Sequence, residues 1–264
     1  VYKLSLSAGC TCPNRDGTLG ARGCIFCSGS GEFAATGSAS IPEQLEQAKY
    51  ILGKKAQGAK FIAYFQDFTN TYGAVSRLEP LFLAAIEEGD VVALSIATRP
   101  DCLPEDILRM LSRLRARKPV FVELGLQTIH DNTAQYIRRG YPLSVFDDAV
   151  QKLHALDIEV IAHQILGLPG ETAVMMSETS RYLGSVHVDG VKLHLLHVLR
   201  GTDLAREYAE GRIQTLELDT YIDILEQCLA VLPPEGKERD PKLELKECRL
   251  PYLKHQSGDI FFPV

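Results

Sequence analysis

The residues best suited to chemistry are four cysteines near the start of the chain, between Cys10 and Cys27. They make up four of the seven cysteines and lie within eighteen residues, interrupted by Gly17, Gly20 and Gly23. Glycine gives such a segment a loop-like backbone that can wrap around a bound group. Thiolates are the ligands that soft metal ions and iron–sulfur clusters prefer. The loop therefore predicts a metal or cluster site.

The spacing of these cysteines allows two kinds of site. Cys12, Cys24 and Cys27 form the pattern C-x11-C-x2-C, with Cys10 available as a fourth thiolate. Four thiolates on zinc would make a closed structural site. Three thiolates on a four-iron cluster would leave one iron open to chelate the amino and carboxylate groups of S-adenosylmethionine (SAM). One electron passed into the sulfonium would then release a 5′-deoxyadenosyl radical, which abstracts hydrogen from an inert carbon.

The elements that would position this loop alternate between strands and helices. Compact apolar runs predict strands, and apolar residues at helical spacing predict helices. We expect strands at 2–6, 60–66, 91–97, 120–126, 158–166 and 188–196. We expect helices at 41–57, 75–88, 104–117, 131–138, 143–156, 171–183, 202–210 and 218–232. Apolar strands separated by helices indicate a parallel sheet covered on both faces.

Polar residues decide how this α/β sheet is arranged. Residues whose side chains could bind ligands or react occur at the end of each of the six strands. They lie within 12–27, 66–72, 98–101, 123–127, 167–171 and 194–200. The carboxyl ends of parallel strands are where α/β folds bind and react. We therefore predict a partial (βα)6, TIM-like barrel with an N-terminal cluster-binding loop, rather than a doubly wound open sheet. Residues 1–234 would form this core domain, and the charged residues 235–264 a C-terminal tail or strap.

Several motifs along the chain resemble those of a known family. In order they are TCPNRDGTLGARGCIFC from Thr11, TNTY from Thr69, ATRPD from Ala97, ELGLQT from Glu123, RRGY from Arg138, GLPGET from Gly167 and GVKLHLLHVLRGT from Gly190. The ordered set resembles the radical SAM superfamily, within the branch similar to the catalytic subunit of Elongator and to the YtqA/YhcC-type, MnmL-like family. The resemblance covers nearly all of residues 1–234.

The resemblance implies roles for individual residues. Cys12, Cys24 and Cys27 would hold a [4Fe-4S] cluster, and Cys10 would be an extra thiol outside that set. Phe26 resembles an aromatic residue that packs near the adenine of SAM. The remaining residues that would bind SAM are Gln66, Thr69, Asn70, Thr98, Arg99, Glu123, Gln127, Arg139, Gly167 and Gly170. Among them, Arg139 resembles an arginine that pairs with the methionine carboxylate.

Charged residues inside apolar strands call for partners. Lys192 and His194 share one face of the sixth strand, because strand side chains alternate. A lone histidine is more often packing, but a buried ammonium is costly without a partner. We therefore predict that Lys192 and His194 contact the substrate. Glu123 also interrupts an apolar strand, so we expect it to pair with Arg99, Arg139 or a ligand amine.

The resemblance further implies a reaction and partners. The enzyme would modify the wobble uridine of tRNA, converting 5-carboxymethylaminomethyl-(2-thio)uridine towards 5-aminomethyl-(2-thio)uridine through a 5′-deoxyadenosyl radical. A flavodoxin or ferredoxin would donate the electron, and a partner methyltransferase would methylate the product. Lys192 could hold the carboxylate of the substrate. The alternatives are a radical SAM enzyme with a different substrate and a zinc-stabilised RNA-binding protein without catalysis.

Composition narrows the class of protein. The chain has 264 residues, of which 45% are hydrophobic and 23% charged, and its net charge is −6. This charge excludes a surface built for indiscriminate nucleic-acid binding, but not a local basic patch on a specific RNA enzyme. The sequence shows no membrane span and no signal peptide, so we expect a cytoplasmic protein. In that reducing compartment, clustered cysteines more often bind metal than form disulfides.

Overall fold

The chain packs as two compact units. The computed structural model describes residues 1–28, 39–233 and 260–263. Unit 1 consists of residues 1–23, 39–125 and 144–160, and unit 2 of residues 24–28, 126–143, 161–233 and 260–263. Most of the predicted tail at 235–264 therefore lies outside the described residues.

Unit 1 is built on parallel strands that follow one another in chain order. They are β1 (Tyr2–Leu6), β2 (Phe61–Phe65), β3 (Val91–Thr98) and most of β4 (Val120–Gln127). Every residue of β2 is buried, and so is nearly all of β3. This burial explains why both strands are continuous apolar runs in the sequence.

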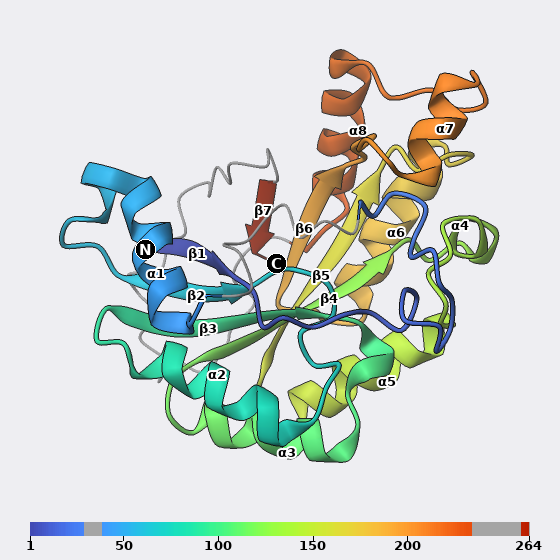
Figure 1. Cartoon of the computed structure of the whole chain (residues 1–264). Helices are drawn as coiled ribbons and strands as arrows, with labels where there is room; N and C mark the ends of the chain where they lie inside the picture. The colour runs from blue at the N-terminus through green and yellow to red at the C-terminus, as the bar shows by residue number, and fades with distance from the viewer. Residues whose placement is uncertain (29–38, 234–259, 264) are drawn as a thin grey trace. The chain divides into compact units, whose positions relative to one another are not determined.

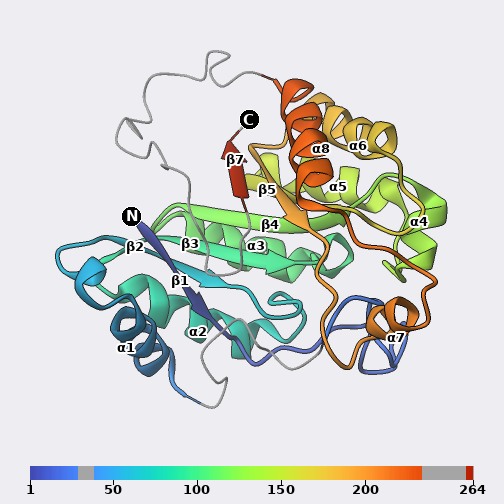
Figure 2. The ribbon, with the colours of Figure 1, turned by 90° about the horizontal axis from the view of Figure 1, so that it is seen from above.

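The helices of unit 1 are α1 (Ile41–Leu52), α2 (Val75–Glu87), α3 (Glu105–Arg115) and α5 (Leu143–His154). In Figures 1 and 2, α2 and α3 lie along the same face of β1–β3, and α1 packs against β1. α1 begins at a capping box, in which the Ser40 hydroxyl accepts from the Glu43 backbone and the Glu43 carboxylate accepts from the Ser40 backbone. Short 3₁₀ turns occupy Gly53–Ala56 and Pro100–Cys102.

Unit 2 contains most of β5 (Glu159–Leu166), β6 (Gly190–Leu195) and β7 (Ile260–Pro263). β5 and β6 are parallel, whereas β7 runs antiparallel to β6. Its helices are α4 (Asp131–Tyr136), α6 (Ala173–Ser185), α7 (Asp203–Ala209) and α8 (Leu218–Ala230), and α6 packs against α8. Within the described residues, no helix is both long and apolar enough to cross a membrane.

The six predicted strands are confirmed, each within two residues of its expected ends. The first predicted helix is shorter than expected, because Gly53 has a φ of 56° and the chain continues as a 3₁₀ turn. The helix expected from residue 171 begins at Ala173, because the Thr172 hydroxyl accepts from the Met175 backbone and caps it. The strand β7 was not predicted, since residues 235–264 show no clear period.

Gln164 shows which way the side chains of β5 point. Its amide donates to the Met176 carbonyl at 2.7 Å and accepts from the Ser180 hydroxyl at 2.8 Å, both on α6. Because strand side chains alternate, His163 and Ile165 point to the opposite face. Gln164 is therefore a satisfied polar residue between strand and helix, and the odd-numbered positions of β5 face away from that helix.

Candidate active site

Cys12 lies in unit 1, in the loop that follows β1. The Arg15 and Asp16 amides donate to the Cys12 carbonyl at 2.8 and 3.2 Å, which closes a tight turn directly after the thiol. The Thr69 amide donates to the Thr11 carbonyl at 3.3 Å. The predicted cluster ligand is thereby joined to the segment after β2, which carries Thr69 and Asn70.

Cys10, two residues earlier, has a different environment. Its side chain is buried, and Arg77 of α2 donates to its sulfur at 3.0 Å and to the Ala8 carbonyl at 2.7 Å. Burial raises the pKa of the Cys10 thiol, while the hydrogen bond and charge of Arg77 act in the lowering direction. The thiol is thus held by the helix layer of unit 1.

Cys24 and Cys27 lie in unit 2, at the two ends of a turn. The Cys27 amide donates to the Cys24 carbonyl at 3.1 Å. Between them, the Ile25 amide donates to the Ile137 carbonyl at 3.3 Å, and its carbonyl accepts from the Leu204 amide at 2.9 Å. The backbone of this turn is therefore fixed from two sides, after α4 and at the start of α7.

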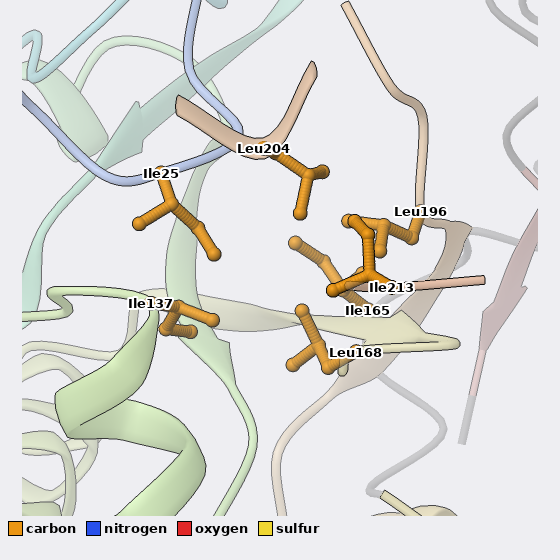
Figure 3. Packing of buried hydrophobic residues seen from close by; sticks show 7 residues of the cluster. All are labelled: Ile25, Ile137, Ile165, Leu168, Leu196, Leu204 and Ile213. Atoms are coloured by element: carbon orange, nitrogen blue, oxygen red, sulfur yellow. The ribbon is translucent and has the colours of Figure 1, made fainter. Parts of the chain in front are cut away.

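The Ile25 side chain anchors the same turn in a hydrophobic cluster. Figure 3 shows its members converging, and they are Ile25, Ile137, Ile165, Leu168, Leu196, Leu204 and Ile213. Phe26, predicted to lie near the adenine, is partly buried and packs against this cluster. Burial of Ile25 thus leaves the flanking cysteines half-exposed at the edge of an apolar core.

An ion pair that the sequence did not suggest supports this turn. The Arg138 guanidinium contacts the Asp203 carboxylate, and the Arg138 carbonyl accepts from the Cys24 thiol at 3.6 Å. The hydrogen bond from Arg138, followed by a second from Arg206, lowers the pKa of Asp203. Arg138 precedes the arginine to which the resemblance gave a role, and only the fold brings it to Asp203.

In unit 1, Asn70 is positioned by its own side chain. Its amide nitrogen donates to the Phe65 carbonyl at 2.9 Å and to the Ala97 carbonyl at 3.0 Å. Asn70 is fully buried, yet its Oδ1 atom has no hydrogen-bond partner within the described residues. A buried acceptor of this kind is costly unless a donor reaches it. A ligand ammonium group would be a suitable donor.

The other strand-end residues of unit 1 have protein partners. Thr98 is buried and shares a 2.5 Å hydrogen bond with Thr71. Gln66 accepts from the Ser5 hydroxyl at 3.1 Å. Arg99 donates twice to Asp101, at 2.8 and 2.7 Å.

Glu123 is fully buried, as expected, and two of its partners come from other strands of unit 1. The Lys3 ammonium of β1 and the Ser95 hydroxyl of β3 both donate to Glu123 Oε1 at 2.5 Å. The sequence suggested Arg99, Arg139 or a ligand amine as the partner, and it did not suggest Lys3. Lys3 is 120 residues away in the chain, so only strand order could reveal this pair.

In unit 2, Arg139 is buried and binds the backbone at the end of β4 and beyond it. It donates to the carbonyls of Thr128 at 2.6 Å, Leu126 at 3.4 Å and Tyr141 at 3.0 Å. Gln127 sits within this bend at a φ of 69°, and its buried Oε1 atom has no hydrogen-bond partner in the described part of the chain. Arg139 therefore shapes the segment that presents Gln127.

Gly167 and Gly170 both adopt positive φ angles, 88° and 83°. A Cβ on Gly167 would lie 3.0 Å from the Leu216 side chain, whereas one on Gly170 would meet nothing within 4 Å. Because this space is open, a ligand could lie close to the backbone of Gly170. Next to it, Glu171 accepts from the Thr128 hydroxyl, and burial raises its pKa. Glu171 had no individual role predicted from the sequence.

Lys192 and His194 share one face of β6, and His163 joins them. His163 is opposite Lys192 in the β5–β6 register, and its ring centroid lies 4.8 Å from that of His194. Lys192 is 3% exposed. The structure thus places three basic side chains together, of which sequence reasoning found two.

Comparison with known proteins decides the family. Residues 15–183 match the model of the radical SAM superfamily, and residues 188–237 match that of the radical SAM C-terminal domain. The chain belongs to the radical SAM superfamily. Similar proteins include the uncharacterized protein YtqA of Bacillus subtilis, 42% identical over 237 residues, which are 89% of this chain and 74% of YtqA. Protein YhcC of Escherichia coli K12 is 36% identical over 238 residues, 89% of this chain and 76% of YhcC.

Solved structures confirm the predicted radical SAM fold. Elp3 of the archaeon Methanocaldococcus infernus has a TM-score of 0.63 and 18% identity, covering 88% of this chain and 54% of that one. Coproporphyrinogen III oxidase (HemN) of Escherichia coli has a TM-score of 0.56 and 16% identity, covering 87% and 51%. The chain thus spans about half the length of these two structures.

The radical SAM enzyme identified in this way uses a [4Fe-4S] cluster and SAM. The residues present fit both cofactors. Cys12, Cys24 and Cys27 are half-exposed thiols on short turns. Asn70 and Gln127 offer buried oxygen atoms that have no donor among the described residues. Within the same residues, no three Cys, His, Asp or Glu side chains are grouped as ligands of a single metal ion.

Proposed function

We propose that this radical SAM enzyme modifies the wobble uridine of tRNA. The observation that carries the proposal is a sequence likeness to the tRNA uridine(34) acetyltransferase of Methanocaldococcus jannaschii, 27% identical over 176 residues, which are 66% of this chain and 32% of that protein. Elongator complex protein 3 of Schizosaccharomyces pombe is 26% identical over 210 residues. The substrate would be 5-carboxymethylaminomethyl-(2-thio)uridine, converted towards 5-aminomethyl-(2-thio)uridine. Such a tRNA substrate would place the enzyme in the cytoplasm.

In this proposal each cofactor is bound by its own set of residues. Cys12, Cys24 and Cys27 would hold the cluster, and SAM would supply a 5′-deoxyadenosyl radical for hydrogen abstraction. Asn70 and Gln127 accept hydrogen bonds from SAM through oxygen atoms that the described protein leaves without donors. Phe26 packs near the adenine, and the backbone beside Gly170 can approach it. The remaining SAM contacts are those of Gln66, Thr69, Thr98, Arg99, Glu123, Arg139 and Gly167.

The substrate contacts are the basic side chains of β6. Lys192 and His194 hold the carboxylate of the carboxymethylaminomethyl group, a negative charge that an unmodified uridine lacks. Lys192 is 3% exposed, and a cation in such a buried position favours a substrate that carries a carboxylate over a neutral one. The hydrogen to be abstracted would be on the carbon next to the amine. A flavodoxin or ferredoxin donates the electron, and a methyltransferase acts on the product.

Nucleoside mass spectrometry tests the proposal. The anaerobically reconstituted enzyme is reduced and incubated with SAM and tRNA that carries carboxymethylaminomethyluridine. We expect loss of this nucleoside together with release of 5′-deoxyadenosine. Release of 5′-deoxyadenosine with unchanged tRNA would reject the substrate and indicate a radical SAM enzyme with a different one. The Lys192→Met variant should release 5′-deoxyadenosine while the carboxymethylaminomethyluridine of the tRNA remains unchanged.

A further inference from the structure

Side chains from four strands of unit 1 form a buried cluster around Glu123. Lys3 of β1 and Ser95 of β3 both donate to Glu123 Oε1 at 2.5 Å. The Lys3 ammonium also lies 4.6 Å from the ring centroid of Tyr64 on β2, a cation–π contact. Glu123 is fully buried, and only 8% of the Lys3 side chain is exposed. None of the motifs that identify the family includes Lys3.

The pair is not explained by stability alone. Moving two charges out of water costs about as much as their attraction returns, so apolar residues of similar size would hold the strands together equally well. Strands of this kind are normally filled with branched apolar side chains. A buried lysine and glutamate therefore indicate that the carboxylate itself is needed.

The register places this carboxylate beside a predicted SAM contact. Glu123 is opposite Ala97 in the β3–β4 pairing. The Ala97 carbonyl accepts from both the backbone and the side chain of Asn70, at 3.2 and 3.0 Å. Lys3 pairs with Ile62 of β2, and Ile62 pairs with Ala93 of β3. Lys3 is therefore level with a residue that precedes Ala97 by four positions. The ammonium therefore reaches towards the carboxyl end of the sheet to meet Glu123.

We propose that Lys3 is a positioning residue that, together with Ser95, holds Glu123 ionised and oriented for SAM. Two donors on one oxygen fix the rotation of the carboxylate, and the ammonium compensates its charge inside the strands. SAM then meets a preorganised acceptor, and no binding free energy is spent on ordering it. This inference rests on the proposed contact between Glu123 and SAM. It does not depend on the tRNA substrate.

Four variants of the reconstituted full chain separate positioning from simple packing. They are Lys3→Met, Lys3→Arg, Glu123→Gln and the double variant with Lys3→Met and Glu123→Gln. For each, the Kd for SAM is measured by equilibrium binding, and the thermal midpoint is measured on the same sample. We expect Lys3→Met to raise the Kd about tenfold to a hundredfold, the range for losing a charged hydrogen bond, and to lower the midpoint. Lys3→Arg should restore both the Kd for SAM and the thermal midpoint.

The double variant decides between the two explanations. It removes both charges, so the thermal midpoint should recover towards that of the unaltered protein. If Lys3 acts by positioning Glu123, the Kd should remain as high as in Glu123→Gln. Recovery of the Kd together with the midpoint would overturn the proposal, as would a normal Kd in Lys3→Met or in Glu123→Gln.

Lys49 offers a matched control. It too forms an ion pair, at 2.8 Å to Asp90, and its ammonium lies 5.6 Å from the Phe61 ring centroid, but it is on α1. Lys49→Met should lower the thermal midpoint without changing the Kd for SAM. An equal rise in Kd from Lys49→Met would show that the effect of Lys3 is general destabilisation. Wobble-uridine modification by the unaltered enzyme is measured separately, so failure of that assay leaves the SAM binding result intact.

Discussion

At the scale of single residues, Cys10 and Cys12 show how two neighbouring thiols can differ. Cys10 is buried and bound by Arg77, whereas Cys12 is half-exposed on a turn. We predict that Cys10→Ser keeps the cluster, because a hydroxyl can still accept from Arg77, and that Cys12→Ser loses it. Iron and sulfide per chain after anaerobic reconstitution measure the outcome. An equal loss of iron from both variants would mean that Cys10 is a ligand.

Glu171 makes stability depend on pH. Burial raises its pKa above the ordinary value of 4.5, against the lowering effects of the Thr128 hydrogen bond and the charge of His130. The folded state therefore holds this proton more tightly than the unfolded state, and stability decreases as the pH rises from 4.5 through the raised pKa. We predict that the free energy of unfolding decreases less over this pH range in Glu171→Gln, which keeps the contact with Thr128. Urea unfolding at a series of pH values measures this free energy for both proteins. The same decrease with pH in both would contradict the prediction.

Burial of polar residues could be predicted from the sequence, but their partners could not. Glu123 stands inside an apolar strand, so its burial and its need for a partner followed directly. Lys3 lies in the first strand, and Asp203 is 65 residues from Arg138. Such pairs depend on strand order and loop path, which no local pattern encodes. The role of Gln164 likewise became clear only when α6 was seen to carry Ser180.

At the scale of elements, the start of α7 holds the turn between Cys24 and Cys27. The Leu204 amide binds the Ile25 carbonyl, and Asp203 contacts Arg138, whose carbonyl accepts from the Cys24 thiol. We predict that Asp203→Asn loosens this turn and speeds removal of iron by a chelator about two- to fivefold, the range for a partly exposed ion pair. Absorbance of the reconstituted cluster follows the reaction.

The control for that experiment lies at the other end of α7. Glu210 pairs with Arg212 at 2.5 Å in an exposed position and does not contact the turn. Glu210→Gln should release iron at the rate of the unaltered protein. Faster release from both variants would indicate that α7 as a whole has been destabilised.

Periodicity predicted the elements better than their ends. Strands β2 and β3 are apolar throughout because both of their faces are buried, so their pattern was unambiguous. Helix ends depended on single residues, such as the positive φ of Gly53 after α1 and the Thr172 cap before α6. β7 is a short antiparallel strand that pairs with β6. Its existence depends on an available edge and not on a periodic sequence of its own.

At the scale of the whole molecule, surface charge limits how the protein can bind RNA. The net charge is −6, and many exposed basic side chains are already paired with acids. Such pairs in the described residues include Arg109–Glu105, Arg113–Glu79, Arg117–Glu87, Lys152–Asp148 and Arg212–Glu210. A guanidinium bound to a carboxylate gains less from a phosphate, because the existing pair must first be broken. Recognition of the proposed tRNA substrate should therefore depend on a few contacts.

The number of contacts with tRNA phosphates can be measured from the salt dependence of the tRNA affinity. Each phosphate contact contributes about 0.7 to 0.9 to the slope of log Kd against log salt. With about three contacts, the Kd of this chain for tRNA should rise less than about a hundredfold between roughly 50 and 200 mM salt. Filter binding at constant pH provides the measurement, with SAM present to keep the site intact. A rise of about a thousandfold or more would indicate six or more contacts, and a continuous basic surface would then have to exist despite the acidic composition.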